Sequence, residues 1–241
     1  MQPYLLLDAG GTLLFPDFRL LRQLIRQRGT DVEEERLRRI ATEYIKRYDE
    51  SLQYPEARLD FSDFLHNLLE RAGVQSAHIP ALLGELHRLD KERSLWSATF
   101  PWVREALQCL STQGYRMSVI SNADGRVHQE LEYLGLDKHF EQIFDSHIVG
   151  YEKPDVRLFQ HALQQLGLAP AQCLYVGDVY FVDVLGANRS GIAAVHLDQY
   201  DLYAGWKGRH IRNIAALPDL LATPDLDLTS EDFFPLRAER Q

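Results

Sequence analysis

The segment LLLDAGGTLL, residues 5–14, joins an apolar run to an aspartate, two glycines and a threonine. The run has the length of a short strand, so Asp8 is expected at the point where a buried strand ends. Ligands of open parallel sheets bind beyond the carboxyl ends of the strands. An aspartate in this place is more often a turn residue, so a functional role for Asp8 depends on what the other strands supply.

Three further apolar runs of strand length follow, at residues 117–120, 173–176 and 192–196. Segments whose apolar residues recur at helical spacing separate these runs. Strands that alternate with helices predict βαβ units, and therefore a parallel sheet covered by helices on both faces. The predicted fold class is α/β.

Residues 16–96 break the alternation, because their apolar residues keep helical spacing and no strand-like run lies among them. This pattern predicts an all-helical subdomain inserted after the first strand. The sheet domain would then comprise residues 1–15 and 97–222. Residues 223–241 are interpreted as a loosely structured tail in which Phe233 and Phe234 dock on the body of the protein.

The amino-acid composition argues against two kinds of binding partner, nucleic acid and the membrane. The net charge of −9 argues against nucleic acid, because binding to phosphate backbones needs a positive surface. Cys109 and Cys173 lie in apolar segments and are interpreted as packing residues. No apolar run reaches the ~20 residues that a membrane span needs, and the N-terminus has no leader pattern. We expect a cytoplasmic protein without a membrane partner.

Polar residues follow two of the other predicted strands. The second strand ends at Ser121-Asn122 and the third at Gly177-Asp178. Lys153 precedes a predicted helix whose first turn contains Pro154 and Asp155. Two carboxylates, a hydroxyl and a lysine at one sheet edge suit a phosphate group and a divalent metal, since Mg²⁺ prefers oxygen ligands.

These four segments resemble, in order, the four motifs of the haloacid dehalogenase (HAD) superfamily, in the subgroup with a helical (C1) cap. The matching segments are DAGGTLL (8–14), ISN (120–122), EKPD (152–155) and GDVYFVD (177–183). The resemblance covers about residues 4–220 and implies a Rossmann-like core with residues 16–96 as the cap. Its phosphatase branch implies a Mg²⁺-dependent hydrolase that acts on a small phosphorylated metabolite.

The resemblance also implies roles for single residues. Asp8 would be the nucleophile, and an aspartyl intermediate would divide one difficult displacement into two easier ones. The metal ligands would be Asp8, Asp178 and the backbone carbonyl of Gly10. Gly11 fits the sharp turn by which backbone N–H groups approach an anion.

Further roles carried over from the resemblance concern the substrate. Ser121 and Lys153 would be catalytic residues that also bind the phosphoryl group, with Asn122 and Thr12 as additional substrate-binding positions. Thr12 would orient the loop. Asp183 would support either the metal ligands or Lys153.

Two positions depart from the phosphatase pattern. Gly10 stands where family phosphatases carry a second aspartate, the general acid and base, whose loss typically lowers rates by ~10²–10⁴. Val182 stands where an asparagine is usual.

A 2-haloacid dehalogenase-like hydrolase is an alternative, because such enzymes also lack the second aspartate. Their fourth motif, however, lacks the Gly-Asp pair found here. A catalytically degraded phosphate- or protein-binding member is the third reading. Asp17 and Asp124 are interpreted as helix-cap or turn residues rather than as substitutes for the missing acid.

Overall fold

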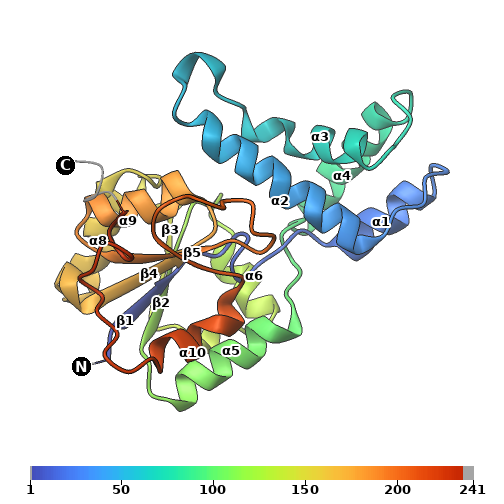
Figure 1. Cartoon of the computed structure of the whole chain (residues 1–241). Coiled ribbons are helices and arrows are strands. Elements are labelled where there is room, and N and C mark those ends of the chain that lie inside the picture. The colour runs from blue at the N-terminus through green and yellow to red at the C-terminus, as the bar shows by residue number, and fades with distance from the viewer. Residues whose placement is uncertain (1, 236–241) are drawn as a thin grey trace. The chain divides into compact units, whose positions relative to one another are not determined.

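The computed structural model describes residues 2–235 and divides the chain into two compact units. One unit combines the chain up to Leu14 with the chain from Thr99 onward, and the other is Phe15–Ala98. The first unit contains the sheet and the second is helical (Figure 1).

The first unit is built on a six-stranded parallel sheet in the order β3-β2-β1-β4-β5-β6. Its strands are β1 (Tyr4–Leu7), β2 (Met117–Ser121), β3 (Ile143–Asp145), β4 (Cys173–Gly177), β5 (Ala193–Leu197) and β6 (Arg209–Ile211). The predicted α/β class is confirmed. The sequence patterns missed β3 and β6, which have three residues each and are too short to show a period.

Helices cover both faces of this sheet. They are α5 (Pro101–Thr112), α6 (Val127–Tyr133), α7 (Ser146–Val149), α8 (Val156–Leu166), α9 (Leu185–Arg189) and α10 (Leu217–Leu221). All four residues of β1 are buried, and alternate strand residues point to opposite faces. Leu6 packs in one apolar cluster with residues of α8 and α9, whereas α5 and α10 lie together on the other side (Figure 1). Because β1 is one of the two central strands, Asp8 follows directly from a strand that is covered on both faces.

The helix after Lys153 begins later than the sequence pattern indicates. Pro154 and Asp155 were expected in its first turn, but α8 begins at Val156. The Asp155 side chain accepts a hydrogen bond from the Arg157 N–H at 2.9 Å, so Asp155 is the N-cap. An aspartate that caps a helix cannot also be its first helical residue, and the expectation was wrong by two residues.

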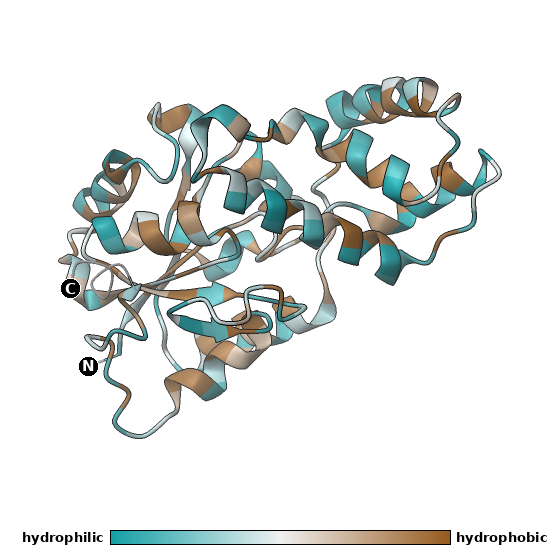
Figure 2. Ribbon diagram, turned by 45° about the horizontal axis from the view of Figure 1, so that its top comes forward, coloured by the Kyte–Doolittle hydropathy of each residue, from teal (hydrophilic) through white to brown (hydrophobic). Residues whose placement is uncertain are grey.

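The helical unit contains α1 (Phe18–Arg26), α2 (Glu34–Ser51), α3 (Phe64–Arg71) and α4 (Ile79–Glu92). Apart from a bridge between Phe15 and Ala98, no residue from 15 to 98 is extended in a strand. Hydrophilic and hydrophobic residues alternate in bands along the helices (Figure 2), as expected where each helix buries one face.

The end of the described chain packs on the first unit. Phe233 and Phe234 are buried, and the Phe233 carbonyl accepts hydrogen bonds from Ala194 N and Asn188 Nδ2, both at 3.0 Å. Residues 236–241 of the predicted tail lie outside the described residues. Within residues 2–235, no helix combines the length and apolar character that crossing a bilayer requires.

Candidate functional site

A tight turn follows β1 and places Asp8 at the carboxyl edge of the sheet. The Ala9 carbonyl accepts hydrogen bonds from the N–H groups of Leu13 and Leu14, both at 2.8 Å. Gly11 has φ +72°, and a Cβ at this position would lie 1.9 Å from Asp178 Oδ2. Only glycine satisfies both conditions, since a side chain would be strained by the backbone and would collide with the carboxylate. The turn therefore brings the backbone of Gly11 against Asp178.

Lys153 connects the distant acidic residues of the site. Its Nζ lies 2.6 Å from Asp8 Oδ1, 2.7 Å from Asp183 Oδ1 and 2.8 Å from the Tyr175 hydroxyl. The Lys153 side chain is 2% exposed, so these contacts form away from bulk water. Buried ion pairs need such additional hydrogen bonds, because the charges have lost their hydration.

Asn122 holds the backbone on which Lys153 sits. Its Nδ2 donates to the Lys153 carbonyl at 2.9 Å, and its Oδ1 accepts from the Lys153 N–H at 2.7 Å. The neighbouring loop is fixed as well, since Asp145 Oδ2 accepts from Gly125 N at 3.0 Å. Asn122 is thus tied to the Lys153 main chain and positions the lysine.

Asp183 reaches Lys153 because the chain after β4 forms one turn of π-helix, Tyr180–Val184. This turn also lets Asp183 Oδ2 accept from Val179 N at 2.9 Å. Gly177 leaves room for the Asp183 carboxylate, because a Cβ at position 177 would lie 2.4 Å from Asp183 Cγ. Both carboxylate oxygens of Asp183 are therefore already engaged by the protein.

Asp178 differs from Asp183 in that one of its carboxylate oxygens has no hydrogen-bond partner. The residue as a whole is partly exposed, yet its Oδ1 is enclosed and has no hydrogen-bond partner. Oxygens of Asp8, Asp178 and Asp183 all lie within 4.8 Å of one another. Since both oxygens of Asp183 bind Lys153 and Val179, Asp8 and Asp178 are the carboxylates of this cluster that remain available to a cation.

The site carries more negative than positive charge when its acids are ionised. Burial raises the pKa of Asp8 to about 6, although Lys153 acts in the opposite direction. Burial and then the charge of Asp8 raise the pKa of Asp178 well above its usual value. Burial alone would lower the pKa of Lys153, but the carboxylates of Asp183 and Asp8 hold it above its usual value. The lysine is therefore an ammonium, and one ammonium faces three carboxyl groups.

A hard divalent cation fits this arrangement. The donors are carboxylate oxygens, one buried oxygen lacks a partner, and the absence of a side chain at Gly11 makes room for the Asp178 carboxylate. Mg²⁺ takes oxygen ligands and is commonly bound by one or two carboxylates. The residues present therefore match the chemistry of Mg²⁺.

The other predicted site residues occupy the same sheet edge. Gly10 lies in the turn after β1, Ser121 is the buried last residue of β2, and Thr12 Oγ1 is enclosed without a hydrogen-bond partner. Two residues considered as substitutes for the missing acid are engaged elsewhere. Asp17 accepts from Leu20 N at the start of α1, and Asp124 pairs with Arg126.

Sequence reasoning missed Tyr175. This tyrosine lies in the apolar run of β4, and its hydroxyl contacts Lys153 and Asp183. A usable signal exists, because the hydroxyl of a buried tyrosine normally requires a hydrogen-bond partner. Tyr175 stands two residues before the Gly-Asp pair, which points to a partner at the sheet edge.

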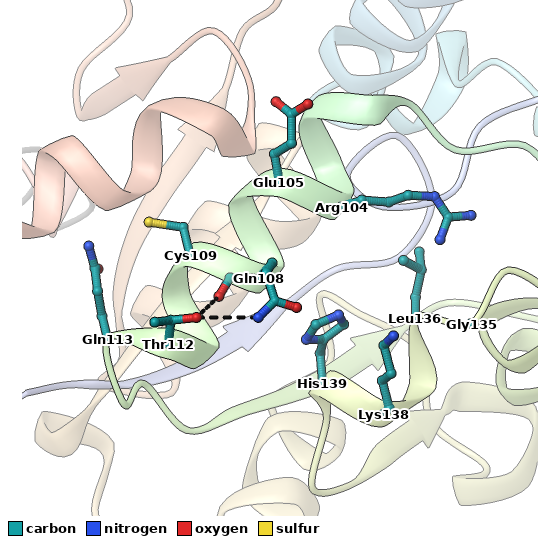
Figure 3. A pocket seen from close by; sticks show the side chains of 10 residues that line it. All are labelled: Arg104, Glu105, Gln108, Cys109, Thr112, Gln113, Gly135, Leu136, Lys138 and His139. Atoms are coloured by element: carbon teal, nitrogen blue, oxygen red, sulfur yellow. Dashed lines mark hydrogen bonds between the residues drawn. The ribbon is translucent and has the colours of Figure 1, made fainter.

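A hollow of about 730 Å³ lies elsewhere in the first unit. It is lined by the outer surface of α5 and by residues 135–139, with Arg104 and Lys138 among the side chains drawn in Figure 3. None of the residues gathered around Asp8 lines it. This hollow is therefore separate from the chemically distinctive groups, which lie at the sheet edge.

Fold and site together define a class of protein: a parallel α/β domain with an Asp, Lys and Asp cluster beyond its central strands. The family model described as haloacid dehalogenase-like hydrolase matches residues 4–191. The chain belongs to the haloacid dehalogenase-like hydrolase family, which confirms the resemblance seen in its four motifs.

Curated relatives with matching segments include phosphatases. Glyceraldehyde 3-phosphate phosphatase of Methanothermobacter thermautotrophicus is 36% identical over 97 residues, which cover 40% of this chain and 43% of that protein. Human haloacid dehalogenase-like hydrolase domain-containing protein 3 is 35% identical over 121 residues, covering 50% of this chain and 48% of that protein. The matches thus span less than half of these two relatives.

Among solved structures, the HAD-hydrolase YfnB from Bacillus subtilis, crystallised with magnesium, aligns with a TM-score of 0.61 and 18% identity. The alignment covers 92% of this chain and all of that one. 2-Haloacid dehalogenase from Pseudomonas syringae aligns with a TM-score of 0.56 and 23% identity, covering 92% of this chain and 99% of that one. At such identities the likeness describes the fold.

Proposed function

We propose that this hydrolase is a Mg²⁺-dependent phosphatase that acts on a small phosphorylated metabolite through an intermediate on Asp8. The buried, unpartnered oxygen of Asp178 beside Asp8 carries the proposal. Two neighbouring carboxylates cannot both ionise without strong repulsion unless a cation compensates them. A site whose carboxylates suit a divalent cation supports phosphoryl transfer over displacement at carbon, which needs no metal.

The proposed mechanism assigns each step to a residue. One oxygen of Asp8 attacks phosphorus while the bond to the leaving oxygen breaks, and that oxygen keeps the electron pair. Ser121 and Thr12 offer hydroxyls to the phosphoryl oxygens, and Lys153 offsets negative charge at Asp8. Water then attacks the phosphorus of the acyl phosphate, and the bond between phosphorus and the Asp8 oxygen breaks with its electron pair returning to the carboxylate. One proton of that water stays on the released phosphate, and the other passes through solvent to the leaving oxygen.

The metal would be held by Asp8, Asp178 and the Gly10 carbonyl. Bound there, Mg²⁺ would supply charge neutralisation for the carboxylates and for the phosphoryl oxygens. Asn122 would act indirectly, because it fixes the main chain of Lys153. Asp183 would support the lysine rather than the metal, since both of its oxygens are occupied.

Gly10 restricts the proposed substrates. A leaving alkoxide needs a proton, and residue 10 has no side chain that could provide one. Phosphate compounds whose leaving groups are stable anions, such as aryl phosphates, should therefore be hydrolysed fastest. We further propose that the helical unit, Phe15–Ala98, is the cap that selects the organic part of the substrate.

The test is a panel of alkyl and aryl phosphate esters assayed with Mg²⁺ and with chelator. Aryl phosphate hydrolysis that requires the metal and disappears in Asp8→Asn would support the proposal. Metal-independent release of halide from a 2-haloacid would instead establish the dehalogenase alternative. Binding of phosphate without turnover of any ester would establish a degraded binding member.

A further inference from the structure

The Tyr175 hydroxyl joins three segments of the site that are far apart in the sequence. It lies 2.8 Å from Lys153 Nζ, 3.0 Å from Asp183 Oδ1 and 3.1 Å from the Ile120 carbonyl. Tyr175 is 0% exposed. The hydroxyl is therefore fixed by the core strand that carries it and by partners on β2, the lysine loop and the π-helix turn.

Counting donors and acceptors shows what the hydroxyl does. A lysine ammonium has three N–H donors and no acceptor. Its three partners here are Asp8 Oδ1, Asp183 Oδ1 and the Tyr175 oxygen. Every N–H of Lys153 is thus engaged, and Tyr175 supplies the one uncharged acceptor. The single proton of the hydroxyl is then donated to Asp183 or to the Ile120 carbonyl, the acceptors on its other side.

We infer that Tyr175 is a positioning residue of this site: its hydroxyl fixes the Lys153 ammonium and, through it, the orientation of the Asp8 carboxylate. Without the hydroxyl, one N–H of a buried ammonium would lack an acceptor, which is strongly unfavourable. The ammonium would then shift toward its remaining partners, and its contact with Asp8 would no longer be fixed. The expected effect on catalysis rests on the proposed function, whereas the positioning of Lys153 does not.

Tyr175→Phe separates the hydroxyl from the ring. The Tyr175 ring packs edge-on against Phe159 with centroids 5.3 Å apart, and phenylalanine keeps that contact. Tyr4→Phe is a matched control, because Tyr4 is also a buried strand tyrosine. Its hydroxyl bonds Ser118 at 2.6 Å at the opposite end of the parallel strands.

The kinetic experiment compares both variants with the wild-type protein on an aryl phosphate. We expect kcat of Tyr175→Phe to fall about 10- to 100-fold, the effect of losing one hydrogen bond to a charged group. KM should change less than kcat, because Tyr175 is 0% exposed and does not contact the substrate directly. Tyr4→Phe should keep the wild-type kcat. A Tyr175→Phe variant with wild-type kcat, or an equal loss in Tyr4→Phe, would overturn the inference.

A second measurement does not depend on activity. In protein labelled with ¹⁵N-lysine, the ammonium resonance of Lys153 is assigned by its absence from Lys153→Arg. We expect slow proton exchange with water in the wild-type protein and a shifted, faster-exchanging resonance in Tyr175→Phe. An unchanged Lys153 resonance in Tyr175→Phe would refute the positioning role, whether or not the protein hydrolyses phosphate esters. Absence of hydrolysis for every ester would refute the proposed function, but not the positioning role.

Discussion

Replacing Asp8 by asparagine is expected to stabilise the metal-free protein while abolishing its proposed activity. Asp8 is 6% exposed, and burial raises the pKa of its carboxyl group from 3.8 to about 6 despite the opposing effect of Lys153. Asparagine has nearly the same shape, and its amide oxygen can still accept the Lys153 N–H. The substitution therefore removes mainly a buried charge that lies close to Asp178.

The sign of the pH dependence follows from the direction of the pKa change. Because the folded pKa is above the unfolded one, the folded protein binds the proton more tightly. Well below pH 3.8 the Asp8 carboxyl group is protonated in both the folded and the unfolded protein, so it does not change the free energy of unfolding with pH. As the pH rises from 3.8 to about 6, the carboxyl group ionises first in the unfolded protein, and the folded protein loses stability. The loss is complete once the folded group has also ionised, above about pH 6. The difference corresponds to ~3 kcal/mol above pH 6. This value is the largest increase in the free energy of unfolding that Asp8→Asn should give near neutral pH.

The assay is urea unfolding of both proteins in the presence of chelator, near pH 8 and again near pH 5. Asp8→Asn should be more stable by ~1–3 kcal/mol near pH 8, and the difference should be clearly smaller near pH 5. Asp198→Asn is the control. Its carboxylate is also buried but accepts the N–H groups of Leu202 at 2.8 Å and Tyr203 at 2.9 Å, so this variant should be destabilised.

Two results would refute this reasoning. One is an Asp8→Asn protein that is less stable than wild type at both pH values. The other is a gain in stability of the same size near pH 8 and near pH 5, because a gain that ignores pH cannot come from the ionisation of Asp8.

Three further predictions concern the turn and its neighbours. Gly11→Ala should weaken Mg²⁺ binding measured by calorimetry and lower stability by at least ~1–2 kcal/mol, since φ is +72° and its Cβ would collide with Asp178; unchanged binding would contradict the described turn. Gly10→Asp should raise kcat for alkyl phosphates by up to ~10²-fold and change aryl phosphates little; equal gains on both would exclude a role in leaving-group protonation. Asn122→Ala should lower the free energy of unfolding by ~1–3 kcal/mol, because both of its bonds to the Lys153 backbone are lost; urea unfolding indistinguishable from wild type would argue against that link.

Much of the fold could be predicted because its central strands are short, continuous apolar runs. The apolar run before Asp8 was correctly predicted as a strand, and the predicted strand 173–176 is one residue shorter than β4, since both strands are buried on both faces. β3 and β6 gave no signal, because three residues cannot establish a period. The start of α8 was misplaced because an aspartate suits the N-cap and the first turn alike.

The site was only partly predictable. Strand ends meet at one edge of a parallel sheet, so Asp8 and Asp178 could be placed together without a structure. The approach of Asp183 to Lys153 was implied only by the family resemblance, as one of two alternatives, since it depends on a π-helical turn that no local pattern announced. Tyr175 was missed for a related reason: in an apolar strand buried on both faces, periodicity does not show toward which partner a hydroxyl points.

The central position of β1 has a consequence for how the protein is made. β1 and Asp8 are synthesised before the other strands of the sheet, and the strands that flank β1 begin only at Met117 and Cys173. At ~5–20 residues per second, Asp183 is added roughly 10–35 s after Asp8. The helical unit, Phe15–Ala98, is complete before the first partner of β1, strand β2, begins at Met117. Until β2 has been made, nascent chains therefore expose β1 as an unpaired apolar strand, and the acidic cluster assembles only after Asp183 has been added.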